Sequence, residues 1–261
     1  MSEKEIDEFR RLLEFGRVEE ALPGLQALLL RAFDWEEQLA IEMMIFACLD
    51  ALGRFAEARE RIQRLLKDAP RQSELYTWIL LGAANFDFDQ KAWPDAIQKF
   101  STLLSEYASV LSKPENEDSR ESIERRLGYA LQFERRFKEA LQYLERASTR
   151  LYDAGDVLYQ LGRCKYELHD FEGARIALES SLKVSPPPYW LALAHYYLGL
   201  SQYCLRQHAR AAHEFEWCLQ NDPQETVPRK TLYDAMKKNY QRLGMTEEVS
   251  RYSRLLKKSN S

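Results

Sequence analysis

Small and apolar residues recur along this chain with the spacing of paired amphipathic helices. Three stretches agree without adjustment, because each places an Ala 12 residues after a Gly. The three pairs are Gly128 and Ala140, Gly162 and Ala174, and Gly199 and Ala211. Apolar or small residues follow each Ala four and seven positions later, as Leu144 and Ala147 follow Ala140, and these positions share one face of a helix. The pattern therefore predicts helical hairpins that repeat along the chain.

The Gly and the Ala of each pair predict where two antiparallel helices cross closely. A larger side chain at either position would hold the two backbones apart, whereas the neighbouring Leu and aromatic residues fill the space beside the crossing. Composition agrees with helices throughout, since 45% of the 261 residues are hydrophobic and only 10 are Gly and 9 are Pro. We therefore expect an all-α protein.

Four further stretches match the pattern less fully and extend it to seven units. The residues that mark the second helix of each unit are Ala21, Ala58, Ala96, Ala140, Ala174, Ala211 and Val249. In the second unit Phe46 stands where the small residue of the first helix is expected. In the third unit we assign that role to Gly82, which makes the following loop two residues longer than elsewhere. Successive markers lie 34 to 44 residues apart, so seven units cover nearly the whole chain.

The repeated residues resemble the tetratricopeptide repeat family. That family pairs a Leu-Gly in its first helix with an aromatic-x-x-Ala in its second, as Leu127-Gly128 and Phe137 with Ala140 do here. The resemblance implies a right-handed α-solenoid of about seven antiparallel helix-turn-helix repeats, with the first helices lining a concave groove. It also implies a protein that binds other proteins and is not an enzyme.

One interval is longer than the others and suggests how the array is divided. The 44 residues between Ala96 and Ala140 include the polar segment 113–118, which contains the helix-breaking Pro114. We expect three repeats in residues 1–112, a polar loop or a hinge at 113–118, and four repeats in residues 119–261. A longer surface loop is the favoured interpretation of the segment.

The charge of the chain is unevenly distributed. The net charge is -4, but the residues from Pro228 onward carry nine Lys or Arg against three acids, giving +6 there and -10 in the rest. We interpret the last repeat as a basic cap with a solvated outer face, and a contact surface for an acidic partner is the alternative. An RNA binder that uses this basic end is a weaker alternative, because the body of the chain is acidic.

Candidate binding residues follow from the groove that the resemblance implies. The positions three before, one after and four after the small residue of each first helix share a face. They supply the peptide-binding candidates Phe86, Arg125, Tyr129, Tyr159, Arg163, Tyr166, Tyr196, Leu200 and Tyr203. Tyr and Arg are enriched at binding hot spots, and Arg163 between Tyr159 and Tyr166 is the strongest candidate. The alternative is that these tyrosines form a core between neighbouring helices.

Some members of the family hold the acidic tails of chaperones with Lys, Arg and Asn on consecutive first helices. This chain departs from that pattern, since it has Tyr129, Tyr159 and Leu200 among the corresponding positions. We therefore expect an apolar or mixed peptide segment in the groove.

The sequence contains no recognisable catalytic or metal-binding motif. It has no Gly-rich phosphate loop, no H-E-x-x-H and no G-x-S-x-G, and its four His are scattered, so we expect no enzyme, no metal and no cofactor. The four Cys, at 48, 164, 204 and 218, form no C-x-x-C pair, and we expect them to be free thiols in a reducing compartment.

The N-terminus is too charged for a secretory signal, and no apolar run approaches the ~20 residues of a membrane span. We therefore expect a cytoplasmic adaptor that holds a protein or peptide segment, without nucleic acid and without membrane insertion. A chaperone or assembly factor that shields subunits of a larger complex is the alternative. The oligomeric state is not predicted.

Overall fold

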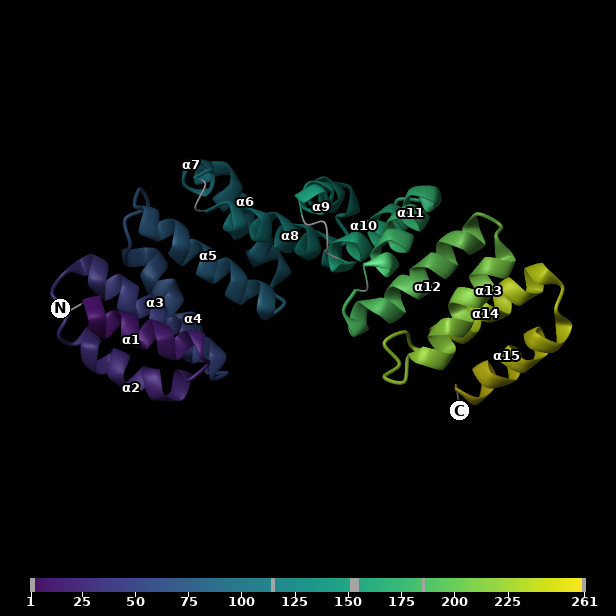
Figure 1. The fold of residues 1–261 in the computed structure, drawn as a ribbon, viewed down its shortest axis with the longest axis horizontal. Helices are drawn as coiled ribbons and strands as arrows, with labels where there is room; N and C mark the ends of the chain where they lie inside the picture. Colours follow the sequence, from purple (N-terminus) through teal and green to yellow (C-terminus); the bar gives the residue numbers. More distant parts are fainter. Residues whose placement is uncertain (1–2, 114–115, 151–154, 185, 260–261) are drawn as a thin grey trace. The chain divides into compact units, whose positions relative to one another are not determined.

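The computed structural model describes residues 3–113, 116–184 except 151–154, and 186–259. Within those residues the secondary structure consists of α-helices (Figure 1). They are α1 (Glu3–Glu14), α2 (Val18–Leu29), α3 (Trp35–Ala51), α4 (Phe55–Asp68), α5 (Glu74–Asp89), α6 (Trp93–Glu106), α7 (Ala108–Leu111), α8 (Glu117–Phe133), α9 (Phe137–Arg150), α10 (Gly155–Glu167), α11 (Phe171–Lys183), α12 (Pro188–Cys204), α13 (His208–Asn221), α14 (Arg229–Leu243) and α15 (Thr246–Lys258). The all-α class is confirmed.

The helices form two compact units, Met1–Arg120 and Glu121–Ser261. Within each unit consecutive helices pack against one another as hairpins. Part of the predicted 113–118 loop, namely Pro114 and Glu115, lies outside the described residues, and its role as a hinge stays a prediction. Beside them, Lys113 forms an ion pair with Glu74 of α5, with 2.7 Å between Nζ and Oε2.

One turn geometry joins the two helices of every predicted unit. In each unit the residue five positions before the marker has a positive φ, between 59° and 72°. These residues are Gly16, Gly53, Lys91, Arg135, His169, Arg206 and Gly244. Glycine adopts this left-handed conformation freely, whereas the four basic residues adopt it at a cost in energy. The recurrence of the turn confirms the seven markers that the sequence predicts.

The small residues lie where the helices cross. All six marker Ala side chains are 0% exposed. A Cβ atom added to the three repeat glycines would lie 2.6 to 2.8 Å from an atom of the second helix, which is closer than real Cβ contacts. The facing pairs are Gly128 with Leu144, Gly162 with Leu178, and Gly199 with Phe215. The predicted crossing points are therefore confirmed.

In the third repeat, formed by α5 and α6, the prediction that Gly82 is the crossing residue is wrong. Its turn residue, Lys91, stands five positions before Ala96 as in the other units, so the loop is not two residues longer. The residue 12 before Ala96 is Ala84, which is buried. Gly82 instead faces α3, where an added Cβ would lie 2.9 Å from Met43 and 3.6 Å from Phe46. The stretch Trp78-Ile79-Leu80-Leu81-Gly82 resembles the Trp-x-x-Leu-Gly opening of the family's first helix, and this match placed the unit two residues out of register.

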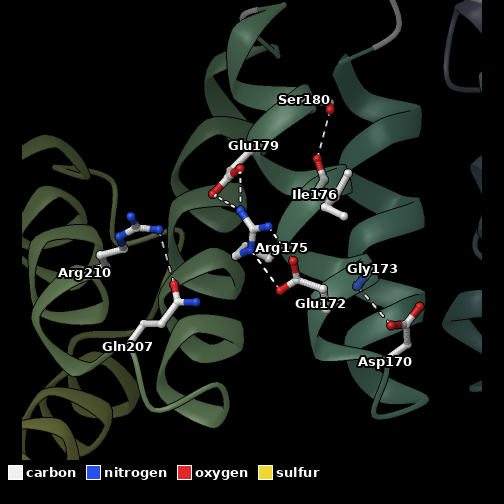
Figure 2. Close-up of polar contacts among 9 residues, drawn as sticks. All are labelled: Asp170, Glu172, Gly173, Arg175, Ile176, Glu179, Ser180, Gln207 and Arg210. Carbon is white, nitrogen blue, oxygen red and sulfur yellow. Dashed lines mark hydrogen bonds and ion pairs between the residues drawn. The ribbon is translucent and has the colours of Figure 1, made fainter.

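A local polar contact stands at the start of five second helices, α2, α4, α9, α11 and α13. The residue before the helix bonds with the residue three positions later, as in Arg17–Glu20, Arg54–Glu57, Arg136–Glu139 and Gln207–Arg210. In α11 a Gly takes the later position, and Asp170 accepts a hydrogen bond directly from the Gly173 N–H at 2.9 Å (Figure 2). Farther along α11, Arg175 lies between Glu172 and Glu179 and pairs with both. Charged groups on these second helices thus satisfy one another.

Candidate functional site

The first helices of the fifth, sixth and seventh hairpins form the candidate surface. Helix α12 packs against both α10 and α14, so side chains from the three helices meet along it. Half-buried aromatic and basic side chains gather there, which is the chemistry expected of a binding surface.

A small hollow lies between α12 and α14. Three predicted residues of α12, Tyr196, Leu200 and Tyr203, line one side of it, because spacings of four and three residues place them on one helical face. The remaining lining residues are Phe215, Thr231, Asp234, Ala235 and Lys238. Its volume of 120 Å³ suits one inserted side chain rather than a whole small-molecule ligand.

A second hollow adjoins the first at Tyr203. It has a volume of 490 Å³ and is lined by Tyr203, Cys204, Arg206, His208 and Arg242. These residues come from the end of α12, the turn that follows it, the start of α13 and the last turn of α14. Because Tyr203 belongs to both linings, the two hollows are neighbours with Tyr203 at their border.

Arg163 and Tyr166 of α10 lie beside Tyr197 of α12. The Arg163 guanidinium carbon lies 5.8 Å from the centroid of the Tyr197 ring, and its Nη1 donates to Oε1 of Gln132 at 3.4 Å. The Tyr166 ring meets the Tyr197 ring edge-on at 5.5 Å. Burial raises the pKa of Tyr166 to about 12, so its phenol stays neutral at physiological pH. Arg163 is therefore held by contacts within the protein.

Two predicted residues lie in the core, and a partner cannot contact them directly in this structure. Tyr159 is 1% exposed because Trp190, at 5.1 Å, and Tyr197, at 6.2 Å between ring centroids, cover its ring. Phe86 is likewise 1% exposed and packs edge-on against Phe46 at 5.8 Å. Phe86 was a candidate because it lies four residues after Gly82, which is not the crossing residue of this repeat. Tyr159 therefore lies where the alternative of a tyrosine core places it, and that alternative did not concern Phe86.

The remaining two predicted residues belong to α8. The Tyr129 hydroxyl donates to the carboxylate of Asp156 on α10 at 2.8 Å, and burial together with this carboxylate raises the pKa of Tyr129. Tyr129 thus ties two successive first helices together. Arg125 is half-buried one turn earlier on α8.

The sequence reasoning missed several residues of the surface, among them Tyr197, Asp234 and Lys238. Tyr197 lies two positions before Gly199, outside the spacings that we used. Asp234 and Lys238 of α14 form an ion pair with 2.6 Å between Nζ and Oδ2. Helix α14 has no Gly at the crossing position, so the rule gave no positions for it. The turn residue Gly244, ten residues after Asp234 and six after Lys238, is the signal that aligns α14 with the other first helices.

The compact unit Met1–Arg120 has a hollow of 410 Å³ between α2, α3 and α4. Its lining includes Trp35, Leu39 and Leu65, but Arg61 and Glu42 pair with each other across it. That pair accounts for two of the charged residues in the lining, which also contains Arg64 and Asp68.

No group of three or more His, Cys, Asp or Glu in the described part of the chain is arranged to hold a metal ion. Among the described helices, none has both the length and the apolar character needed to cross a bilayer. The four Cys are free thiols, three of them buried and Cys204 exposed.

Comparison with known proteins agrees with the repeats. Residues 49–110 and residues 134–195 each match a model of the tetratricopeptide repeat. The chain belongs to the tetratricopeptide repeat family. Its members typically bind other proteins rather than catalyse reactions. No curated protein sequence matches the chain significantly.

Solved structures share the tetratricopeptide fold at low sequence identity. The apo form of RapI superposes with a TM-score of 0.67 and 16% identity, covering 97% of this chain and 74% of RapI. Pseudomonas aeruginosa PilF has a TM-score of 0.64 and 14% identity over 87% of this chain and 93% of its own. YrrB, described as a tetratricopeptide protein with an unusual peptide-binding site, has a TM-score of 0.58 and 16% identity, covering 73% and 90%.

Proposed function

We propose that this protein is a non-catalytic adaptor that holds a peptide or protein segment on the surface formed by α10, α12 and α14. The repeats support a role in protein interaction, and the finer assignment to this surface rests on its side chains. Arg163, Tyr166, Tyr196, Leu200 and Tyr203 are the contact residues that we retain.

The observation that carries the proposal is the hollow between α12 and α14. Tyr196, Leu200 and Tyr203 remain partly accessible there, although neighbouring rings bury Tyr159 completely. Half-exposed Tyr and Leu around a recess offer apolar contact area with a polar hydroxyl at the edge, as binding hot spots do. The peptide-binding site named for YrrB adds support by analogy of fold alone.

The test is affinity capture from a native lysate with a Leu200→Ala and Tyr203→Ala double variant. We expect this variant to lose the proteins that the wild-type chain captures, because the recess loses both an apolar wall and an aromatic edge. Mass spectrometry compares the captured proteins, and circular dichroism shows that the helices persist.

The matched control is Tyr189→Ala, which removes a tyrosine from the same helix. Tyr189 is 58% exposed and does not line the hollow. If the double variant captures the same proteins as the Tyr189→Ala control, the proposed surface is wrong. Suppression of client aggregation without a stable partner would instead favour the chaperone or assembly-factor alternative.

The proposal also includes a cytoplasmic location and a function without a cofactor. Four free thiols suit a reducing compartment, and the proposed binding role requires no cofactor.

A further inference from the structure

We infer that the segment bound on this surface is acidic, with an apolar side chain in the smaller hollow and a neighbouring carboxylate in the larger one. This inference rests on the proposed function and adds the chemistry of the partner. It concerns the edge of the array near the turn between α12 and α13, rather than the middle of the first helices.

The first step is the composition of the larger hollow. Arg206 and Arg242 are exposed and come from two different hairpins, yet they line the same 490 Å³ recess. His208 adds a third nitrogen-bearing side chain, and its Nδ1 lies 3.2 Å from Oδ1 of Asn239. The lining contains no carboxylate. Two arginines that line one recess, with no acid in its lining, suit a carboxylate, which accepts paired hydrogen bonds from Arg.

The second step is the continuity with the apolar hollow. Tyr203 lines both recesses, so a segment that places a side chain beside Leu200 and Phe215 continues directly toward Arg206. The one acid of the smaller lining, Asp234, is already paired with Lys238. That pairing reduces the repulsion that an acidic segment would otherwise meet.

The third step is the charge of the surroundings. Residues from Pro228 onward carry +6, whereas the remainder of the chain carries -10. An acidic segment is therefore attracted to this end and repelled by the rest of the chain, which favours one binding position over others along the repeats.

A purely structural role for the two arginines is the competing explanation. Arg206 follows the end of α12 and Arg242 lies in the last turn of α14, where a cation interacts favourably with the helix dipole. The decisive measurement must therefore be one that helix stabilisation leaves unchanged, namely selectivity between two peptides.

The experiment uses two fluorescein-labelled peptides of equal length, one alternating leucine with aspartate and the other leucine with asparagine. Fluorescence anisotropy with the full chain measures both affinities. We expect the aspartate peptide to bind roughly tenfold more tightly, as charge-assisted hydrogen bonds predict. The Arg206→Gln and Arg242→Gln double variant is expected to remove this preference while it binds the asparagine peptide as the wild type does.

The control removes the same charge from the same end of the chain. Lys230 and Lys257 are exposed and lie outside both linings, so the Lys230→Gln and Lys257→Gln variant should keep the preference. Equal loss of preference in both double variants would show a general charge effect and overturn the inference.

The remaining outcomes separate this inference from the proposed function. If the wild type binds both peptides equally and Tyr203→Ala weakens both, the adaptor stands and the carboxylate inference is overturned. If neither peptide binds, the inference is overturned, and the capture assay with the Leu200 and Tyr203 variant still decides the adaptor proposal. Sedimentation velocity measures whether a second copy of the chain, rather than a peptide, occupies the surface. Self-association that requires Arg206 and Arg242, and that the aspartate peptide does not disrupt, would also overturn the inference.

Discussion

The first compact unit (Met1–Arg120) and the second compact unit (Glu121–Ser261) fill their helix crossings with different residues. In the second unit the crossing position, 12 residues before the marker, is Gly in three successive hairpins, and a Leu or Phe of the second helix fills the space. In the first unit that position is Phe9, Phe46 and Ala84. The large rings are accommodated because a Gly faces each of them: an added Cβ on Gly24 would meet Phe9, and one on Gly82 would approach Phe46.

This comparison indicates that the combined volume of the facing side chains at a crossing matters more than a Gly at one fixed position. A ring on one helix and a Gly on another replace the Gly and Leu of the family pattern. The second unit, whose crossings are filled by Leu and Phe, leaves several Tyr residues on its first helices at the surface.

The largest expected effect is the loss of a ring from the first unit. Phe46→Ala should lower the free energy of unfolding by about 3 to 5 kcal/mol, because its buried ring fills the space beside Gly82 and contacts Phe86. Urea unfolding followed by circular dichroism measures the change. Phe33→Ala removes a 97% exposed ring and should have little effect. Similar values for the two variants would show that Phe46 does not fill the crossing.

A smaller effect is expected from overfilling the second unit. Gly162→Val should cost about 1 to 3 kcal/mol, since an added Cβ already lies 2.6 Å from Cγ of Leu178. The paired variant Leu178→Ala makes room for the new side chain. We therefore expect the double variant to be more stable than the sum of the single changes predicts, and additive effects in a double-mutant cycle would contradict the proposed contact.

Alkaline pH should distinguish the units through their tyrosines. Burial raises the pKa of Tyr129, Tyr159, Tyr166 and Tyr197 above the ordinary value of 10.0. Above pH 10 the unfolded chain loses these phenolic protons while the folded unit keeps them, so stability falls as pH rises. The loss approaches about 1.4 kcal/mol per pH unit for a fully buried tyrosine such as Tyr159.

Hydrogen exchange measured at neutral pH and above pH 10 can follow the two units separately. We expect amides of the second unit to lose protection first. Earlier loss of protection in the first unit would contradict the importance of these buried phenols.

The smallest expected effect concerns the turns. Arg135 has a φ of 59°, so Arg135→Gly should stabilise the protein by about 0.5 kcal/mol after the greater flexibility of Gly in the unfolded chain is deducted. Glu134→Gly, which introduces the same flexibility beside it without relieving a positive φ, should destabilise. Thermal unfolding of both variants checks the sign, and equal destabilisation would show that the left-handed turn carries no strain.

The register of most hairpins could be predicted because it depends on short-range spacing. A Gly and an Ala 12 residues apart specify a crossing within one hairpin, whatever surrounds it, and this spacing holds for three of the seven hairpins. It failed at Gly82, where a local motif match outweighed the distance to Ala96. The actual role of Gly82 depends on Phe46 of the preceding hairpin, which no spacing within α5 reveals.

The sequence alone therefore determined the class of fold, the markers of the seven second helices and the candidate face of α8, α10 and α12, because these properties repeat within about 40 residues. Only the tertiary structure decided which tyrosines remain accessible. Trp190 from the next hairpin covers Tyr159, whereas Tyr203 borders a hollow with α14. The exposure of a side chain depends on the volume of neighbours that are distant in sequence, and helical periodicity carries no information about that volume.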